Sequence, residues 1–463
     1  MDLTFQMDAA DRNPLYQQLY QFIKSEIQSG KIGTAEKLPS KRKLSAYLNI
    51  SQNTIQSAYD QLIQEGYVTP SERRGFFVNR IENLARLDAA RPAAAEKRNE
   101  QKPVRYDFSY TGVDPEGFPY ALWRRLYKET VDESDRELLL LGESQGRREL
   151  RAAIAGYLHQ SRGVNCEAGQ IVLGSGTEFL LQILILLFGP GSVFGIENPG
   201  YEKLSQQFAG NHVQHRAIDI DGAGMIPQKI EESGANILCL TPAHQFPSGE
   251  IMPISRRVQI LNWANAKPGR YIIEDDYDGE FKYSGKPVPA LQGLDQGGRA
   301  IYMGAFSKSL SPAVRVSYMV LPEALLKQYR RNLSYMICPV PGIEQKMLAR
   351  FIADGYFERH LNRMRTIYKK KRELLVESIK KMHCPVQILG ADAGLHLLLR
   401  VDNSMTEDRL IASAREAGVK VYGISGYYSR TRQDGTPHIL LGYASLAEGE
   451  IARAVEILDG AWS

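Results

Sequence analysis

The sequence predicts two folded regions: a winged helix-turn-helix at residues 1–80, mostly α-helical with a β-wing, and a larger α/β region at residues 108–463. Three observations support this division. Apolar residues recur at helical spacing in the first eighty residues and end in a hairpin pattern. This periodicity disappears between Ile81 and Arg105. From Tyr106 onward, strand-like apolar runs alternate with helical patterns, which is typical of an α/β fold. We call residues 1–80 the head, 81–107 the linker and 108–463 the body.

Composition limits the classes of protein to which the chain can belong. With 463 residues and 43% hydrophobic content, the chain exceeds one typical domain and can bury a full core. The net charge of +4 is mild, so nucleic-acid binding has to be sought in local clusters. The longest apolar run, Phe179 to Phe188, is too short to span a bilayer, and the N-terminus does not resemble a signal peptide. We therefore expect a cytoplasmic protein that does not contact a membrane.

The four cysteines are far apart and have no metal or redox-pair spacing, which predicts reduced thiols. His244 has no second histidine at ligand spacing, so we expect no metal.

The head follows the order helix, short helix, turn, helix, hairpin. Ser40 is a good N-cap for a short helix that ends near Leu48, and Ser51 for the helix that follows. Gly66 ends that helix, and two short apolar runs flank Arg73-Arg74-Gly75 as a wing. The apolar positions are Leu15, Leu19, Phe22, Ile23 and Ile27 in the first helix, and Ile55, Ala58, Tyr59, Leu62 and Ile63 in the third.

Polar residues in the head suit DNA. The first turn of the third helix is wholly polar and carries donors and acceptors for base edges. The basic cluster that follows Ser40 suits phosphates, although such a cluster could also be a solvated helix face. The residues that we expect to contact DNA are Ser40, Lys41, Arg42, Ser51, Gln52, Asn53, Thr54, Arg74 and Gly75.

The segment from Leu38 to Val78, LPSKRKLSAYLNISQNTIQSAYDQLIQEGYV…RRGFFV, resembles the GntR-type winged helix of bacterial repressors. That pattern usually has arginine at the position of Gln52 and often another at the position of Gln56. The resemblance therefore implies DNA binding but does not predict the operator sequence.

In the linker, residues 91–103 are alanine-rich, charged and bounded by prolines. Such a segment cannot bury a face, so we expect a mobile or partly helical tether.

A lysine ends the strand-like run that begins at Ala300. Burial at such a strand end would lower the pKa of Lys308, and a neutral amine can form a Schiff base with a carbonyl cofactor. Arg315, seven residues on, could bind a phosphate. Taken alone, a lysine in this position is usually a solvated loop residue.

Three other segments could complete a cofactor site. Ser175-Gly176-Thr177 lies between a strand and a helix, where backbone N–H groups bind anions. Tyr201 could stack on an aromatic ligand or simply fill a loop. Asp275 belongs to an acidic cluster after buried isoleucines, which is costly unless a cation such as a pyridinium nitrogen lies near.

In order and separation these residues resemble those of the fold-type I aminotransferases, across nearly all of residues 106–463. The resemblance implies a large domain with a mainly parallel sheet, a smaller C-terminal α/β domain at roughly 350–463, and pyridoxal 5'-phosphate (PLP). Lys308 would hold PLP as an internal aldimine, Asp275 would pair with the pyridine nitrogen, Tyr277 would bond the ring hydroxyl and Tyr201 would stack on the ring. The phosphate would be held by Ser175, Gly176, Thr177, Ser307 and Arg315.

A GntR-type head joined to an aminotransferase-like body resembles the MocR/GabR-type subfamily of GntR regulators. Its GABA-type member is expected to carry an arginine for its effector's carboxylate where this chain has Lys203. Arg430 is our candidate for the residue that holds the effector carboxylate, with Arg432 as the alternative, because His438 occupies the strand position where aminotransferases usually have that arginine.

The resemblance implies a homodimeric transcriptional regulator that binds promoter DNA and senses an amino acid, a related amine or PLP itself through Lys308. The alternative is a catalytically active aminotransferase with an accessory DNA-binding head. Every residue needed for aldimine chemistry is present, so the sequence leaves slow half-transamination open.

Overall fold

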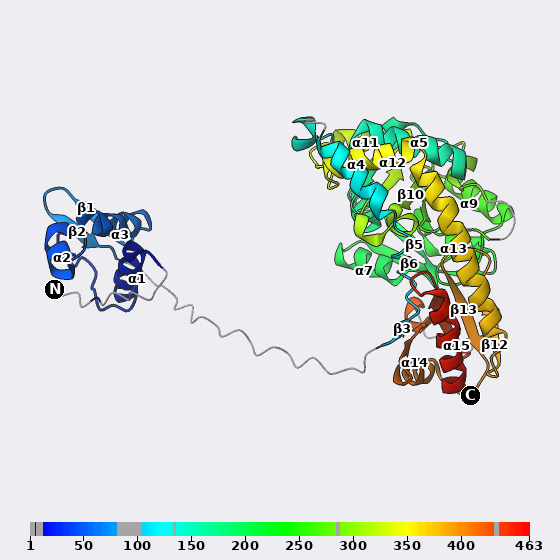
Figure 1. Ribbon diagram of the computed structural model, residues 1–463. Coiled ribbons are helices and arrows are strands. Elements are labelled where there is room, and N and C mark those ends of the chain that lie inside the picture. The colour runs from blue at the N-terminus through cyan, green and yellow to red at the C-terminus, as the bar shows by residue number, and fades with distance from the viewer. Residues whose placement is uncertain (1–4, 6–12, 81–103, 133–135, 284–287, 430–434) are drawn as a thin grey trace. The chain divides into compact units, whose positions relative to one another are not determined.

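The computed structural model describes residues 5, 13–80, 104–132, 136–283, 288–429 and 435–463 (Figure 1). The chain forms two compact units, Met1–Glu100 and Gln101–Ser463. Most of the expected linker, residues 81–103, lies outside the described residues. Among the described helices, none combines the length and the apolar character that crossing a membrane would require.

The head has the predicted winged helix-turn-helix. Its elements are α1 (Leu15–Gln28), α2 (Lys41–Leu48), α3 (Gln52–Gln64) and the antiparallel strands β1 (Val68–Ser71) and β2 (Gly75–Val78). Both expected caps are present: Ser40 Oγ accepts from Lys43 N at 3.2 Å, and Ser51 Oγ accepts from Thr54 N at 3.0 Å. Asn49 ends α2 in the left-handed region, with φ of 55°, which produces the tight turn between the two helices.

The large domain of the body is built on one eight-stranded sheet. Its strand order is β4-β11-β10-β9-β8-β5-β6-β7. The strands β5, β6, β8, β9 and β10 pair in parallel, whereas β11 is antiparallel to both of its neighbours and β7 is antiparallel to β6. Their bounds are β4 Ile171–Gly174, β5 Val193–Asn198, β6 Gln214–Asp221, β7 Gly224–Met225, β8 Ile237–Leu240, β9 Tyr271–Asp276, β10 Ala300–Ala305 and β11 Ser317–Val320.

Helices cover both faces of this sheet. Because side chains alternate along a strand, Ile301 and Met303 of β10 pack in a core that also contains residues of α6, whereas Tyr302 packs on the other side with residues of α5 and α12. The helices of the large domain are α4 (Tyr120–Asp132), α5 (Arg148–Arg162), α6 (Thr177–Phe188), α7 (Glu202–Gly210), α8 (Pro227–Ser233), α9 (Ile254–Ala266), α10 (Phe306–Ser309), α11 (Glu323–Asn332) and α12 (Gly342–Ala353).

The small domain follows the long helix α13 (Tyr356–Ile379), drawn in yellow, which runs from the large domain to α15 (Figure 1). Its four-stranded sheet has the order β12-β13-β16-β15. The other elements are β12 Val386–Leu389, β13 His396–Val401, α14 Glu407–Glu416, β14 Val419–Lys420, β15 Tyr422–Gly423, β16 His438–Gly442 and α15 Glu448–Trp462. The strand β3 (Tyr106–Asp107) pairs with β14, so the last residues of the expected linker are part of this domain.

Candidate functional site

The sheet brings the ends of β4, β9 and β10 to one edge. Asp275 of β9 pairs in register with Met303 of β10, and Gly174 of β4 pairs with Ser317 of β11. Since β9 and β10 are parallel, the residues that follow them emerge at the same edge. Three motifs that are far apart in the sequence therefore lie around one site.

Lys308 lies in the short helix α10, directly after β10, and is half-buried. Its Nζ donates a hydrogen bond to the carbonyl oxygen of Tyr110. Burial lowers the pKa of Lys308 to about 8, although Asp278 opposes this shift. About a tenth of the amine is thus neutral at pH 7, far more than for an ordinary lysine, as expected for a lysine that reacts with a carbonyl compound.

Asp275 is the acid of its cluster that faces the site. Its Oδ1 is buried and has no hydrogen-bond partner among the described residues. Burial raises the pKa of Asp275 to about 7, and Asp276 and Asp278 add to this shift. Glu274, by contrast, accepts from the backbone N–H groups of Leu291 and Gln292 at 2.8 and 2.9 Å. A buried acceptor without a donor is costly, and a protonated ring nitrogen would satisfy it.

A small cradle lies between the end of β4 and Arg315. Gly176 has a φ of 119°, and a Cβ at this position would lie 2.1 Å from Arg315 Nη2. Arg315 Nη2 donates to the carbonyl oxygen of Ser175 at 2.9 Å and lies 3.3 Å from Glu178 Oε2. Helix α6 begins at Thr177, so its first N–H groups lie next to the cradle. These groups suit a phosphate. Arg315 would then bind the phosphate in place of the carboxylate of Glu178.

Ser317 was not identified from the sequence. Its Oγ accepts from Gly176 N at 3.0 Å and donates to the carbonyl oxygen of Gly174 at 3.0 Å. The hydroxyl thus holds the glycine turn in place. Only the pairing of β11 with β4 reveals this contact.

We predict that Gly176→Ala lowers the affinity for PLP at least tenfold. The new Cβ would clash with Arg315. Alanine would also have to keep the positive φ of this turn, which L residues rarely adopt. Absorbance or fluorescence titration of the full chain with PLP measures the affinity. Gly210→Ala is the matched control, because no atom lies within 4 Å of a Cβ there. Equal affinities in the two variants would contradict the assignment of the cradle.

Tyr277 contacts a buried histidine that sequence spacing did not link to the site. Tyr277 Oη lies 3.0 Å from His244 Nδ1, and the same nitrogen lies 3.0 Å from Asp278 Oδ2. The ring of His396, in β13, lies 4.7 Å from that of His244. Within the described residues, His244, Asp278 and His396 form a group whose ligand atoms could hold a metal ion. The hydrogen bonds of His244 Nδ1 instead favour a role in orienting Tyr277.

Tyr201 and Lys203 lie at the start of α7, and both line a cavity that Asp275 also lines. The ring of Tyr201 stands edge-on to Phe246, with centroids 5.6 Å apart, and Lys203 Nζ lies 5.8 Å from the centre of the Tyr201 ring. This cavity is lined by residues from six of the elements described above, and the lining residues include Thr177, Tyr201, Lys203, Glu197, Asp275 and Met303. The fold therefore brings together four residues that the sequence singled out: Thr177, Tyr201, Lys203 and Asp275.

Glu197 is a buried acid of the same cavity that the sequence analysis missed. Its Oε2 accepts from Thr241 Oγ1 at 2.6 Å, and burial raises its pKa to about 7. Its Oε1 has no partner in the described part of the chain. Asp275 and Glu197 are therefore two buried acids that line this cavity.

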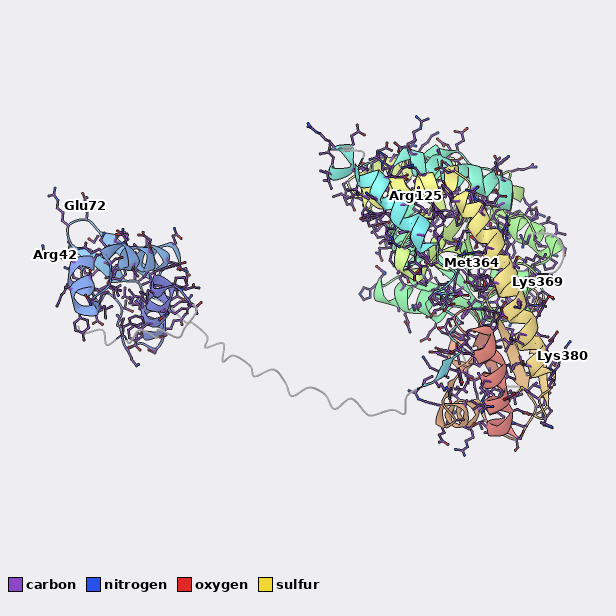
Figure 2. The ribbon with its side chains drawn as sticks, in the orientation of Figure 1. Arg42, Glu72, Arg125, Met364, Lys369 and Lys380 are labelled. Atoms are coloured by element: carbon purple, nitrogen blue, oxygen red, sulfur yellow. The ribbon has the colours of Figure 1, made fainter. Side chains whose placement is uncertain are left out.

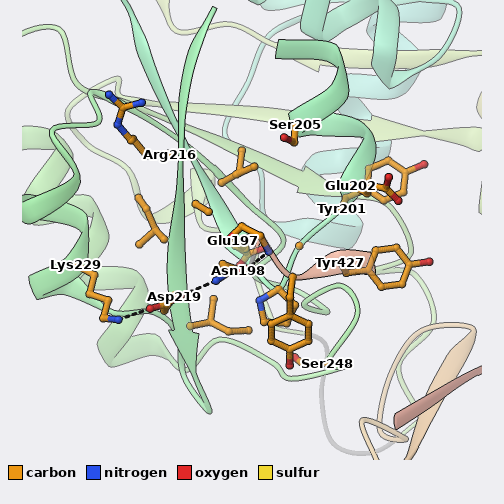
Figure 3. A pocket seen from close by; sticks show the side chains of 18 of the residues that line it. Glu197, Asn198, Tyr201, Glu202, Ser205, Arg216, Asp219, Lys229, Ser248 and Tyr427 are labelled. Carbon is orange, nitrogen blue, oxygen red and sulfur yellow. Dashed lines mark hydrogen bonds and ion pairs between the residues drawn. The ribbon is translucent and has the colours of Figure 1, made fainter. Parts of the chain in front are cut away.

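A wider pocket of about 1140 Å³ opens on the other side of Tyr201, at the ends of β5 and β6 (Figure 3). Asn198 links its walls: Nδ2 donates to Asp219 at 2.6 Å, and Oδ1 accepts from Ser429 N at 2.9 Å. Tyr427 of the small domain accepts through its carbonyl from Gly200 N at 3.1 Å. The small domain thus docks against the end of β5. Arg430 and Arg432 lie outside the described residues.

In the head, the residues expected to bind DNA lie on α2, on the first turn of α3 and on the wing. Arg42 of α2 and Glu72 of the turn between β1 and β2 lie at the surface (Figure 2). Arg74 covers the ring of Phe77, with its guanidinium carbon 5.7 Å from the ring centre. Gly75 has a φ of 111°, and a Cβ there would meet Lys37. The wing turn therefore requires glycine for both conformation and space.

Comparison with known proteins defines the class. Residues 15–78 match the family described as bacterial regulatory proteins, gntR family, and residues 117–458 match aminotransferase class I and II. The chain therefore belongs to the MocR-type GntR regulators, helix-turn-helix transcription regulators whose head is fused to an aminotransferase domain. The class I and II aminotransferases are a PLP-dependent family.

Similar proteins support this assignment. The chain is 40% identical to an uncharacterized HTH-type transcriptional regulator, YhdI, of Bacillus subtilis, over 100% of this chain and 99% of YhdI. It is 30% identical to the probable rhizopine catabolism regulatory protein MocR of Rhizobium meliloti, over 97% and 94% of the two chains. The fold of the body resembles kynurenine aminotransferase of Pyrococcus horikoshii, with a TM-score of 0.68 and 23% identity over 78% of this chain and 91% of that one.

Proposed function

We propose that this regulator binds PLP in its body, detects an amino compound there and changes its binding to promoter DNA in response. One observation carries the proposal: the buried Oδ1 of Asp275 lacks a donor within the described residues, in a cavity that also contains Tyr201 and Thr177. A protonated pyridine nitrogen is the donor that this acid would accept. The low pKa of Lys308 supports the same cofactor.

Each residue has a separate role in this proposal. Lys308 supplies the amine that bonds the aldehyde carbon of the cofactor. Asp275 keeps the ring nitrogen protonated, Tyr277 donates to the ring hydroxyl, and Tyr201 covers the ring. The phosphate is held by Ser175, Gly176, Thr177, Ser307 and Arg315. When bound, the cofactor would supply an electrophilic carbon that reacts with amines, and Lys308 would hold that carbon in the absence of an effector.

Lys203 is the cation that we propose for the carboxylate of the effector, together with Arg430. Lys203 lines the cavity, and it offers a single ammonium group where arginine offers two parallel donors. An effector changes DNA binding only by its differential affinity for two states of the protein. The contacts of Tyr427 and Ser429 with the end of β5 are ones that could differ between these two states.

We also propose that the body forms a homodimer. The three leucines of the segment Leu139–Leu141 are 70–82% exposed, and Tyr335 and Ile337, before α12, are 74% and 56% exposed. Gly342, at the start of α12, lies near the carbonyl oxygen of Leu138, so the leucine segment lies beside the start of α12. Exposed apolar side chains such as these favour an interface with a second copy. Two heads would then bind two half-sites of the operator.

An active aminotransferase remains the second candidate, because the partly neutral amine of Lys308 is suited to proton transfer as well as to cofactor binding.

The visible absorption spectrum of the full chain, titrated with PLP and then with amino compounds, tests the proposal. We expect a band with PLP that one amino compound changes persistently, with a parallel change in DNA binding. Loss of the band, restored by a keto acid without any effect on DNA binding, would favour the enzyme instead. A chain that stays colourless with PLP would refute the cofactor.

A further inference from the structure

The helix α3 exposes a narrow stripe on the side away from the head core. It buries Ile55, Ala58, Tyr59 and Leu62. Asn53, Ser57, Asp60 and Gln64 recur at intervals of four, three and four residues, and all four are exposed. In helix-turn-helix proteins the N-terminal residues of the second helix contact base edges. Base reading therefore depends on the residues in the first two turns of α3.

The side chain of Gln56, a position where the GntR pattern often has arginine, is hydrogen-bonded to other residues of the head. Lys41 Nζ donates to its Oε1, and its Nε2 donates to Asp60 Oδ1 at 2.5 Å. Both ends of the amide are thus in use. Gln56 holds Lys41 of α2 against α3, which makes it a positioning residue for a cation.

The remaining hydroxyl groups nearby are also engaged. Ser57 Oγ donates to the backbone carbonyl of Asn53 at 3.1 Å, and Ser51 Oγ lies 2.8 Å from Thr54 Oγ1. Gln52 and Asn53 differ from these residues: both are exposed, and in the part of the head that the structure describes neither side chain has a hydrogen bond or ion pair. Two free amides therefore lie at the N-terminal end of α3.

The chemistry of these amides selects a base. A carboxamide presents one donor and one acceptor in a plane, which matches N7 and N6 of adenine in the major groove, whereas arginine and lysine match N7 and O6 of guanine. The helix α3, QNTIQSAYDQLIQ, contains no lysine or arginine. It therefore has no side chain of the type that most often reads guanine.

We infer that Gln52 and Asn53 read adenine in the major groove, so that each operator half-site carries A·T base pairs where it faces the start of α3. Lys41, Arg42 and Arg74 then supply sequence-independent attraction to phosphates. This inference rests on the DNA binding of the GntR head and is independent of the cofactor.

Selection of duplexes from a randomised library by the full-length protein, at a fixed salt concentration, tests the inference. The wild-type chain should enrich adenine at adjacent positions of each half-site. Gln52→Arg should change one of these positions from adenine to guanine, with a preference shift of about ten- to a hundredfold in competition binding. Asn53→Ala should lose the adenine preference at the neighbouring position.

Two variants separate base reading from charge. Gln64→Arg adds the same charge as Gln52→Arg, about 18 Å further along the exposed side of the helix, and should leave the selected sequence unchanged. Arg42→Ala should weaken all sequences alike and lower the slope of log K against log salt by about one. Enrichment of guanine by the wild-type chain, or an unchanged base preference in Gln52→Arg, would overturn the inference. The PLP spectrum is unaffected by either outcome, so the two proposals fail separately.

Discussion

Lys308→Ala is expected to abolish the covalent retention of PLP and, with it, the response of DNA binding to the effector. Alanine has no amine, and the effector would have no lysine to displace. The phosphate cradle and Asp275 remain, so we expect weak binding of PLP, at least tenfold poorer, without the absorption band of the wild-type protein. Spectral titration and DNA-binding anisotropy of the full chain measure both effects.

Lys203→Ala is the informative comparison for Lys308→Ala. We propose both lysines for the same site, but Lys203 lies beside Tyr201 and is proposed to hold the effector alone. We expect Lys203→Ala to keep the PLP band and to require a higher effector concentration for the same response. Binding of DNA without effector should be normal in both variants. A full response in Lys308→Ala would refute the proposed sensing mechanism.

Asp275→Asn is expected to have opposite effects on the stability of the free chain and on cofactor binding. Asparagine cannot hold the ring nitrogen in its protonated form, so the affinity for PLP should fall at least tenfold. Without cofactor, however, the variant should unfold at a higher temperature than the wild type at pH 8. The order of the two unfolding temperatures should reverse when PLP is saturating.

The sign of the stability effect follows from the pKa of Asp275. Burial raises this pKa from its ordinary value of 3.8 to about 7. Between these two values the folded chain binds more protons than the unfolded chain, so stability falls as the pH rises from about 4 to about 7. The loss is at most about 4 kcal/mol, since one pKa unit corresponds to about 1.4 kcal/mol. The Asp275→Asn chain does not lose this stability as the pH rises. The difference in stability between the variant and the wild type should therefore vanish below about pH 4.

Glu274→Gln is the control for Asp275→Asn on the same strand. The pKa of Glu274 is also raised to about 7, mainly by burial, but its carboxylate accepts from two backbone N–H groups. Glutamine would place a donor against one of them and destabilise the chain. The affinity of the Glu274→Gln variant for PLP should equal that of the wild type. A cofactor-free Asp275→Asn chain that is less stable than the wild type at pH 8 would contradict the assignment of Asp275.

Local signals in the sequence were sufficient for the head. The caps Ser40 and Ser51, the periodic apolar residues of α1 and α3 and the Arg73-Arg74-Gly75 wing turn act over a few residues, and the structure confirms the winged helix-turn-helix that they predict. The sequence did not reveal that Gln56 is bound to Lys41 and Asp60. That contact depends on how α2 packs against α3.

In the body, the sequence by itself identified the strand ends that carry Lys308 and Asp275, because a charged residue after a buried apolar run is a local signal of an unusual environment. The acidic cluster alone did not distinguish Glu274, Asp275 and Asp276; the family resemblance selected Asp275, and in the tertiary structure Asp275 lines the cavity. Alternation along β9 separates Asp275 from its two neighbours, but the packing of helices on the sheet determines which face becomes the site. The same holds for Ser317 beside Gly176 and for His396 beside His244. These pairs meet through strand order and domain docking, which local sequence patterns do not encode.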